Sequence, residues 1–281
     1  MQYKRLIVQK EGHVATITLN RPETGNAFDF RIMEEIDYVF RDDLAKDANI
    51  RAVILTGAGK YFCTGVDLTM FSSSDPMVKE EELEQGVASS RVKQESEETP
   101  WGKGTVVGAV VVMRAMPKPI IAAINGAAVG LGFSFALACD IRIASDRARF
   151  SAVFVKRGLA PDTGASFTLP RVVGFPKACE LMLTGDMIDA AEAQRIGVVS
   201  RVVPHDQLMD AARELAGKIA RNPPLAVAAN KESLYKSMME TDIIKQMEHE
   251  ISYQDKLLNT EDFKEAAAAF LEKREATFKG R

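Results

Sequence analysis

The sequence has little that is typical of a disulfide-stabilised, metal-binding or membrane-spanning protein. Its three cysteines, Cys63, Cys139 and Cys179, are far apart and match neither a disulfide framework nor a metal-ligand pattern. No run of about 18 apolar residues predicts a membrane span. Charges interrupt residues 1–19, so this stretch lacks the apolar centre of a signal peptide. We therefore expect a soluble, cytoplasmic protein without a bound metal.

The charge balance is also unremarkable, because the formal net charge is only -3. Such a chain has no general attraction for nucleic acid or for an anionic membrane, so any phosphate contact must be local. With 281 residues, of which 46% are hydrophobic, the chain can bury a substantial core. Neither length nor composition limits it to a small binding module.

The first part of the chain predicts an α/β fold. Two β-rich runs, Lys4 to Gln9 and His13 to Leu19, flank Lys-Glu-Gly and indicate a hairpin. Asp29 is placed to cap a helix whose apolar residues recur at helical spacing. Ala52 to Thr56 follows as a short buried strand. Strand, helix and strand in this order predict a βαβ unit.

The last part of the chain, from His205 onward, is almost entirely helical in pattern. Asn222-Pro223-Pro224 interrupts it, and Phe263 to Phe278 has the pattern of a final amphipathic helix. We expect a β/α core over residues 1–200 and a helical region over residues 201–281. This region would pack on other subunits, although folding back on its own core fits the pattern equally well. Between core segments, residues 72–100 are polar and acidic and predict a surface insertion beside a site.

Two glycine-containing loops, Gly57 to Asp67 and Asn125 to Leu131, each follow a predicted strand. The second loop lies within Pro119 to Asp140, where a strand-like run enters a small-residue turn and a helix-like run leaves it. The first N-H groups of a helix lack partners and carry partial positive charge, so this turn is suited to an anion. If the two strands are parallel neighbours, both loops meet at one sheet edge. The alternative is that the glycines only make tight turns.

Several separated motifs together resemble the crotonase family, also called the enoyl-CoA hydratase and isomerase family. They are NRPETGNAF at 20–28, GKYFCTGVDL at 59–68 and INGAAVGLGFSFALACDIRIAS at 124–145, followed by LPRVVG, ELMLTG and AAEAQRIGVVSRVV. The resemblance implies an α/β fold with a crotonase-like ββα spiral core and a C-terminal helical trimerisation region. It further implies a homotrimer or homohexamer, an acyl-CoA substrate, and no cofactor beyond the coenzyme A of the substrate.

The resemblance also assigns residues to a thioester site. The thioester oxygen would be held by the backbone N-H groups of Val66 and Leu131, and each such donor is worth roughly 3 kcal/mol of barrier. Phe270 and Lys273, in FLEK, would contact the nucleotide end, although a solvated helix charge is an equal alternative for the lysine. The residues expected to line the coenzyme A channel are Gly25, Asn26, Ala27, Thr64 and Asp67.

The chain departs from the family pattern at the two positions where hydratases carry glutamates. These positions hold Ser134 and Phe154, which would contact substrate but cannot move a proton as carboxylates do, so ordinary hydration is disfavoured. Asp162 remains at a position where isomerases of the family carry an acid. One carboxylate suffices for a 1,3 proton shift, so the resemblance implies an enoyl-CoA double-bond isomerase with Asp162 as base.

A structural role for Asp162 competes with this one, because the residue precedes Thr163-Gly164-Ala165-Ser166, where a helix cap is expected. Accepting helix N-H bonds would lower its pKa and make it a poorer base. Its apolar neighbours, Phe154, Leu159 and Pro161, would oppose that change by desolvation.

Four other functions stay open. An atypical hydratase and a non-catalytic acyl-CoA-binding or scaffold subunit both fit the motifs. An aryl-CoA dehalogenase-like enzyme would use Asp162 as nucleophile, but the chain has no histidine between His13 and His205. A hydrolase would need Ser134 with His205 or His249 as its base. The acyl group is left open between fatty and aromatic acids, with Phe133, Met70, Phe71 and Trp101 as further candidate pocket residues.

Overall fold

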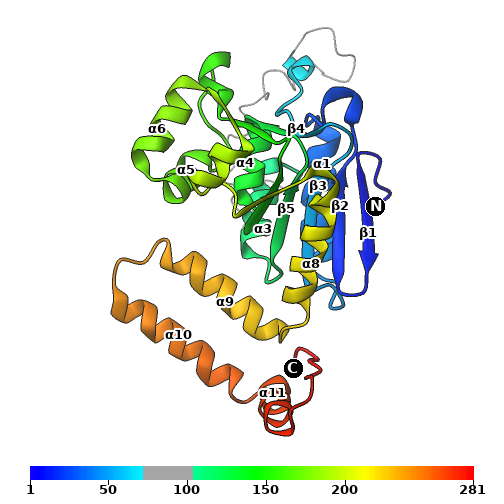
Figure 1. Ribbon diagram of the computed structural model, residues 1–281, viewed down its shortest axis with the longest axis vertical. Helices are drawn as coiled ribbons and strands as arrows, with labels where there is room; N and C mark the ends of the chain where they lie inside the picture. The colour runs from blue at the N-terminus through cyan, green and yellow to red at the C-terminus, as the bar shows by residue number, and fades with distance from the viewer. Residues whose placement is uncertain (72–103) are drawn as a thin grey trace.

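The computed structural model describes residues 1–71 and 104–281 of the chain. In this part, two β-sheets and their covering helices form the upper body in Figure 1, and three C-terminal helices extend below it. The acidic stretch at 72–100 and Trp101 lie outside the described residues. None of the described helices is long and apolar enough to cross a membrane.

The larger sheet has six strands in the order β1-β2-β3-β5-β7-β10. They are β1 (Leu6–Glu11), β2 (Val14–Leu19), β3 (Ala52–Gly57), β5 (Ile120–Ile124), β7 (Ile141–Ser145) and β10 (Arg201–Val203). β1 and β2 form an antiparallel hairpin and every other neighbour is parallel. The predicted hairpin and βαβ unit are thus confirmed. Since β3 and β5 are parallel neighbours, the loops that follow them leave the same edge of the sheet.

A second sheet of four strands was not expected from the sequence. Its strands, in the order β4-β6-β8-β9, are β4 (Tyr61–Cys63), β6 (Ala127–Val129), β8 (Arg149–Ser151) and β9 (Met187–Asp189). β4, β6 and β8 are parallel, whereas β8 and β9 are antiparallel. The two glycine-containing loops therefore lie side by side for two reasons. The strands before them, β3 and β5, are neighbours, and the strands inside them, β4 and β6, are neighbours as well.

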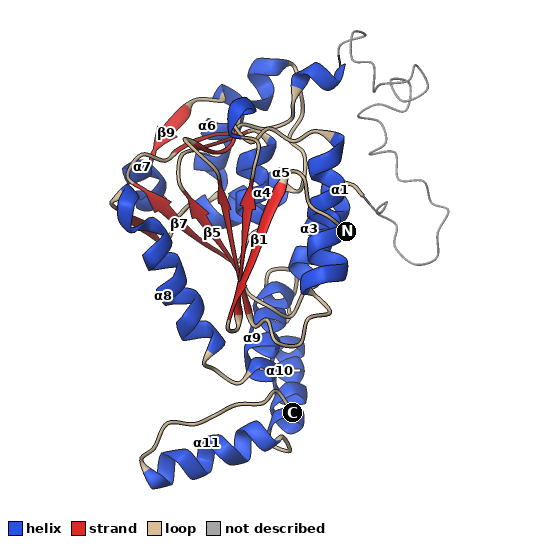
Figure 2. Ribbon diagram, turned by 90° about the vertical axis from the view of Figure 1, so that its right-hand side faces the viewer, coloured by secondary structure: helices blue, strands red, loops and turns tan. Residues whose placement is uncertain are grey.

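Helices cover both faces of the larger sheet (Figure 2). The helices are α1 (Phe30–Tyr38), α3 (Val106–Ala115), α4 (Leu131–Ala138), α5 (Ala165–Val173), α6 (Phe175–Thr184), α7 (Ala190–Arg195), α8 (Leu208–Ala220), α9 (Pro224–Ser237), α10 (Ile243–Leu257) and α11 (Glu261–Glu272). A π-helical turn, η2 (Val39–Leu44), continues α1, and short 3-10 turns are η1 (Pro22–Thr24), η3 (Leu68–Phe71), η5 (Val153–Arg157) and η6 (His205–Gln207).

Local caps fix where the core helices begin. Asp29 accepts a hydrogen bond from Ile32 N at 2.8 Å, so the predicted cap of α1 is confirmed. Thr105 accepts one from Gly108 N at 3.0 Å and starts α3. Each cap satisfies one of the N-H groups that a new helix leaves without a partner.

α8 packs on the face of the larger sheet that is opposite to α1 and α3. Its small residues Ala212 and Ala216 lie with Leu208 against buried side chains of the sheet, such as Ile54 and Ile121. The other face packs α1, α3 and α4 into the main core. The first helix of the 201–281 region thus covers the core sheet, and the boundary at residue 200 stays a prediction.

α9, α10 and α11 lie below the sheets in Figure 1. The sequence predicted a final helix over residues 263–278, and this was wrong at its end. α11 stops at Glu272, because Lys273 adopts a left-handed backbone with φ +54° and ends the helix. The following residues turn back, and Lys279 N donates to Asp262 Oδ1 at 2.7 Å near the start of α11.

Candidate active site at the start of helix α4

The first side of the candidate site is the segment after β4. Phe28 N donates to Gly65 O at 2.8 Å and Asp67 N donates to Phe28 O at 2.9 Å, which makes an isolated parallel bridge between Phe28 and Val66. Successive N-H groups of such a segment point to opposite sides, so the N-H of Val66 points away from Phe28. Gly65 allows this path because its φ is +109°, which favours glycine.

The second side is the first turn of α4. Leu131 is its first residue, so its N-H belongs to the group that a helix leaves without an internal partner. A Cβ built on Gly65 would lie 3.8 Å from Leu131 N, so the two segments are in contact there. Among the described residues, Val66 N and Leu131 N donate to no protein acceptor. The structure therefore brings these two predicted donors together at one place.

The contact between the two segments leaves no space for adjustment. A Cβ on Gly132 would lie 2.2 Å from the carbonyl oxygen of Cys63, far below any real contact. The backbone of α4 thus packs directly on the end of β4. This packing fixes the distance between the Val66 and Leu131 N-H groups.

The loop at residues 20–28 closes the site beside Val66. Thr64 Oγ1 donates to Gly25 O at 3.2 Å, which brings two of the predicted channel residues together. The side chain of Asn26 is fully buried, however, and this differs from the channel lining that we expected. Its Nδ2 donates to Tyr61 O at 2.7 Å and to Ala58 O at 2.9 Å. The Asn26 side chain therefore supports the loop from within.

Arg21 is a buried residue of this loop that the sequence analysis did not single out. Its guanidinium donates to Ala27 O at 2.9 Å and to Asp67 Oδ2 at 3.0 Å. Burial alone would raise the pKa of Asp67, but hydrogen bonds from Thr69 and Arg21 outweigh it and hold that pKa below its usual range. Asp67 is thus an ionised anchor and is poorly suited to act as a base. The sequence signal that could have identified Arg21 is its position directly before Pro22, in the turn motif at 20–28.

Asp162 lies beside Ser134 of α4, in a partly buried position. Its Oδ1 accepts a hydrogen bond from Thr163 Oγ1 at 2.7 Å. The Ser134 hydroxyl and the Cys63 thiol are both close enough to the carboxylate for an electrostatic influence between the groups. Burial raises the pKa of Asp162, although the hydrogen bonds from Thr163 and Ser134 act in the opposite direction. No described cation contributes to this change.

The competing cap role of Asp162 is not what the structure shows. The N-cap of α5 is Gly164, with no capping side chain, and Ala165 N donates to the main-chain oxygen of Asp162 at 2.9 Å. The carboxylate therefore remains available to a ligand. Desolvation is the main cause of the raised pKa of Asp162, as expected, although Leu159 and Pro161 are themselves exposed in the single chain.

Ser134 and Phe154 complete the wall of the site. Ser134 is fully buried and its Oγ lies 3.3 Å from Gly130 O, one turn back in α4. The ring of Phe154 is buried, and its Cε1 lies 3.9 Å from where a Cβ on Gly130 would be. Burial raises the pKa of the nearby Cys63 thiol to about 12, so this cysteine is not a ready nucleophile. Ser134 and Phe154 thus lie beside the first turn of α4, at Gly130.

The serine-histidine pair of a hydrolase is absent at this place among the described residues. His205 Nδ1 lies 3.1 Å from Ser145 Oγ, and His249 packs edge-on against Tyr253 of α10. Within the described part of the chain, neither ring contacts Ser134. The described part of the chain contains no group of three or more His, Cys, Asp or Glu side chains placed to hold a metal.

Phe270 and Lys273 are not brought to this site within one chain. They lie on and after α11, at the opposite end of the molecule from the loops that follow β4 and β6 (Figure 1). Phe270 is 84% exposed. A contribution from these residues would have to come from a neighbouring copy.

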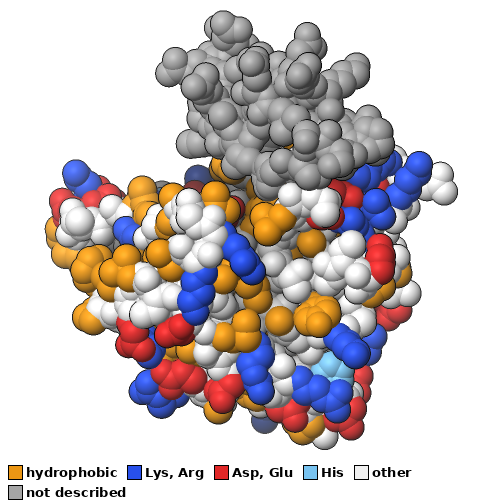
Figure 3. Space-filling view, turned by 90° about the horizontal axis from the view of Figure 1, so that it is seen from above, with side chains coloured by type: hydrophobic (Ala, Val, Ile, Leu, Met, Phe, Trp, Pro, Cys, Tyr) orange, Lys and Arg blue, Asp and Glu red, His pale blue; other side chains and the backbone are white. Residues whose placement is uncertain are grey.

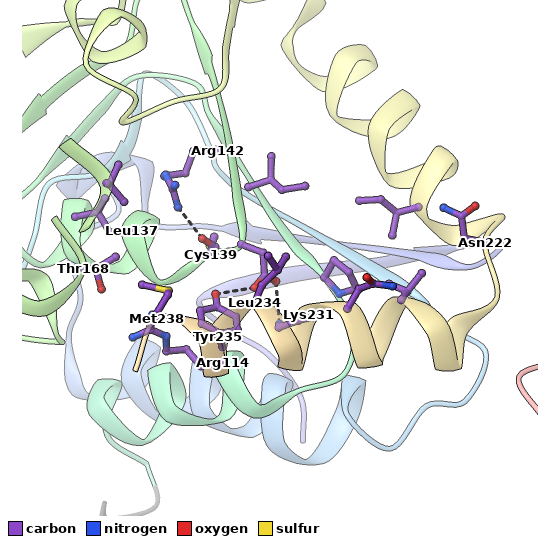
Figure 4. A pocket seen from close by; sticks show the side chains of 17 residues that line it. Arg114, Leu137, Cys139, Arg142, Thr168, Asn222, Lys231, Leu234, Tyr235 and Met238 are labelled. Carbon is purple, nitrogen blue, oxygen red and sulfur yellow. Dashed lines mark hydrogen bonds and ion pairs between the residues drawn. The ribbon is translucent and has the colours of Figure 1, made fainter. Parts of the chain in front are cut away.

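A cavity of about 470 Å³ lies elsewhere, between α9 and the region where α4 ends (Figure 4). Arg114, Asp140, Arg142, Lys231 and Tyr235 are among its lining residues. Since α4 has eight residues, this cavity is separated from Leu131 by about 12 Å of helix. It holds none of the predicted site residues.

Comparison with known proteins gives a consistent family assignment. The family model for enoyl-CoA hydratase/isomerase matches residues 9–281. A short-chain-enoyl-CoA hydratase of Clostridium acetobutylicum is 37% identical over 275 residues, covering 98% of this chain and 97% of the relative. A carnitinyl-CoA dehydratase of Proteus mirabilis is also 37% identical, covering 96% of both.

Solved structures agree with these sequence matches. The enoyl-CoA hydratase of Bacillus anthracis superposes with a TM-score of 0.87 at 34% identity, covering 99% of this chain and 100% of that chain. These relatives carry the names of hydratases and a dehydratase, so their names do not support a preference for isomerisation. Motifs, crotonase fold and matches together show that the chain belongs to the enoyl-CoA hydratase/isomerase family of enzymes.

Proposed function

We propose that this enzyme is an enoyl-CoA double-bond isomerase in which Asp162 moves the proton. The observation that carries the proposal is the position of the Asp162 carboxylate. It lies against the first turn of α4, has a raised pKa, and no described cation contributes to that shift. A carboxylate with a pKa above its usual range is a stronger base than an ordinary one, and its pKa lies closer to the working pH, where taking up and giving back a proton are better balanced.

The proposed reaction is a 1,3 proton shift on an acyl-CoA thioester. Asp162 takes a proton from the carbon next to the thioester carbonyl of a 3-enoyl-CoA, and the electron pair moves onto the carbonyl oxygen. The N-H groups of Val66 and Leu131 donate to that oxygen while the dienolate exists. Asp162 then returns the proton two carbons further along. The product is a 2-enoyl-CoA, and no atom is gained or lost.

Hydration is less well supported by the residues of this site. Adding water needs groups that position the water, accept one proton and deliver another. The wall formed by Phe154 is apolar, and Ser134 is fully buried. The names of the relatives nevertheless keep hydration as the second candidate, with Asp162 as its one carboxylate.

Coenzyme A recognition is the second part of the proposal. The backbone of the 20–28 loop and the residues around Thr64 border the Val66 N-H, so the thioester end would lie there. We propose that Phe270 and Lys273 of a second copy contact the nucleotide end, since one chain holds them far from the site. Lys273 would then act as a point charge on phosphate.

Self-association into trimers or hexamers belongs to the same proposal. Exposed apolar side chains follow one another on α9 and α10, including Leu234, Ile244, Met247 and Ile251. Hydrophobic side chains also gather on the α6 side of the molecule in Figure 3. Patches of this kind are typical of protein-protein contacts. Sedimentation analysis should therefore give a particle of three or six chains.

The test of function is product analysis in deuterated water. With a 3-enoyl-CoA, the wild-type protein should form 2-enoyl-CoA that carries deuterium. Formation of 3-hydroxyacyl-CoA from 2-enoyl-CoA at ordinary rates would instead establish hydration. Release of halide from a 4-halobenzoyl-CoA would establish dehalogenase-like chemistry, and binding of every thioester without any exchange would leave a non-catalytic subunit.

A further inference from the structure

Thr163 has a backbone conformation that its residue type rarely adopts. Its φ is +47°, in the left-handed region, and its side chain is only 8% exposed. The other described non-glycine residues with positive φ are Asn26 and Lys273. Asparagine tolerates this region and Lys273 only ends a helix, whereas a β-branched residue there is an outlier. Such outliers persist only where the surrounding structure enforces them.

The turn itself does not require a threonine at this position. A glycine would adopt the same φ without strain, and the next residue, Gly164, already does so with φ +79° and open space around it. What glycine would not provide is a hydroxyl group. Thr163 Oγ1 lies 2.7 Å from Asp162 Oδ1 and donates to it, so the strained residue is hydrogen-bonded to the candidate base.

We propose that Thr163 is a positioning residue for the Asp162 carboxylate, an inference that rests on the proposed proton shift. By donating to Oδ1, the hydroxyl fixes the plane of the carboxylate. The other oxygen, Oδ2, then takes the proton from one carbon and returns it to another. A base that serves two carbons must keep one orientation through both transfers, because misplacement by about 1 Å costs on the order of a hundredfold in rate.

Three variants separate positioning from folding. Thr163→Val keeps the shape and the strain but removes the hydroxyl, so we expect kcat to fall about 10- to 100-fold with KM little changed. Thr163→Ser keeps the hydroxyl and should retain most of the activity. Thr163→Gly removes both strain and hydroxyl, so it should be as slow as the valine variant while melting at a higher temperature than wild type.

The pH profile provides a readout that a merely structural role would not move. A hydrogen bond to the charged form lowers a carboxyl pKa, so its loss in Thr163→Val should shift the acid limb of kcat/KM to higher pH. The same rise should appear in a carboxyl-carbon NMR titration of Asp162, assigned by its absence in Asp162→Asn. This measurement needs no turnover. Thr184→Val is the matched control, because Thr184 Oγ1 also donates over 2.7 Å, to Glu180 O on exposed α6.

The outcomes separate this proposal from the proposed function. If Asp162→Asn abolishes turnover but Thr163→Val keeps the wild-type kcat, pH profile and Asp162 pKa, only the positioning role is overturned. If Asp162→Asn remains active, both proposals are overturned. A valine variant that is slow, with a serine variant that is active, supports the positioning role. Loss of folding in the valine variant leaves the decision to the serine and glycine variants, and a glycine variant with wild-type kcat overturns the proposal.

Discussion

The two ends of helix α4 each have an aspartate nearby, and the two carboxylates have opposite surroundings. Asp140 follows the last turn and is held by a cation, because Lys231 Nζ donates to its Oδ2 at 2.8 Å. Tyr235 and Ile120 N donate to it as well, both at 2.7 Å. Asp162, beside the first turn, receives a hydrogen bond from the Thr163 hydroxyl, and no described cation contributes to its raised pKa.

The difference shows that a buried carboxylate can serve to hold a structure together or to take part in chemistry, depending on whether a cation lies beside it. A cation beside a carboxylate stabilises its charge and favours the ionised form. The Asp140 cluster therefore links α9 to the core, as the dashed lines in Figure 4 show. A carboxylate that is desolvated without a cation binds its proton more tightly. This is the property that the proposed proton shift requires of Asp162.

The largest expected effect is the loss of catalysis in Asp162→Asn. Removing a general base costs roughly a hundred- to ten-thousandfold in rate. Thioester binding should persist, because the Val66 and Leu131 N-H groups are untouched. Turnover of 3-enoyl-CoA and calorimetric binding of a saturated acyl-CoA check the two parts. A variant that retains more than about a tenth of the wild-type rate would contradict the assignment of the base.

The next effect is on stability at the other end of α4. Lys231→Met leaves Asp140 partly buried without its cation, so the free energy of unfolding should fall by about 3–5 kcal/mol. Urea unfolding at one fixed protein concentration measures it. Lys218→Met, which breaks an exposed pair with Glu214, should change stability by only about 0–1 kcal/mol. Equal losses of unfolding free energy in the two variants would show that the partly buried Asp140–Lys231 pair is no more important for stability than the exposed Lys218–Glu214 pair.

A smaller effect is expected from adding a methyl group at the tight contact between the start of α4 and the end of β4. Gly132→Ala would force a methyl group toward the Cys63 carbonyl, which should cost about 1–3 kcal/mol and displace the Leu131 N-H. Gly217→Ala makes the same change inside α8, where the nearest atom is 3.9 Å away, and should stabilise by about 0.5–1 kcal/mol. Thermal unfolding and turnover of both variants test this. An active, stable Gly132→Ala would show that the contact is not tight.

The smallest effect concerns pH. Because the pKa of Asp162 is raised in the folded state, the folded chain holds its proton more tightly than the unfolded chain. The contribution of this group to the free energy of unfolding is fully present below the unfolded pKa of about 3.9, and it is lost as pH rises through the folded pKa. Asp162→Asn should therefore gain stability relative to wild type on going from acidic to neutral pH. A difference that is constant across this range would mean that burial does not raise the pKa.

Local pattern was sufficient for much of the fold. The strand, turn and helix over 119–140, the cap at Asp29 and the break before α9 were all predicted, because each depends on neighbours within a few residues. The four-stranded sheet was missed, since the small residues of β6 look like part of a turn. The pair of Asp140 and Lys231 spans 91 positions, and nothing local signals it.

The candidate site was predicted in outline through the family resemblance rather than through physics alone. Val66 and Leu131 lie together as expected, because parallel pairing brings their two loops to one edge. The burial of Asn26 was not foreseeable from its turn motif, since it depends on carbonyl groups of another loop. The strained backbone of Thr163 has no sequence signal either, because threonine is an unlikely residue for it.

The backbone origin of the two donors has a consequence for how this sequence can change over generations. At positions 66 and 131 any residue except proline supplies the same N-H group, so substitution there can reshape the surrounding pocket without deleting a donor. At positions 65 and 132, backbone angle or lack of space restricts the choice to glycine. A saturation library should therefore show permissive positions at the donors and strict ones beside them, the reverse of a site built from side chains.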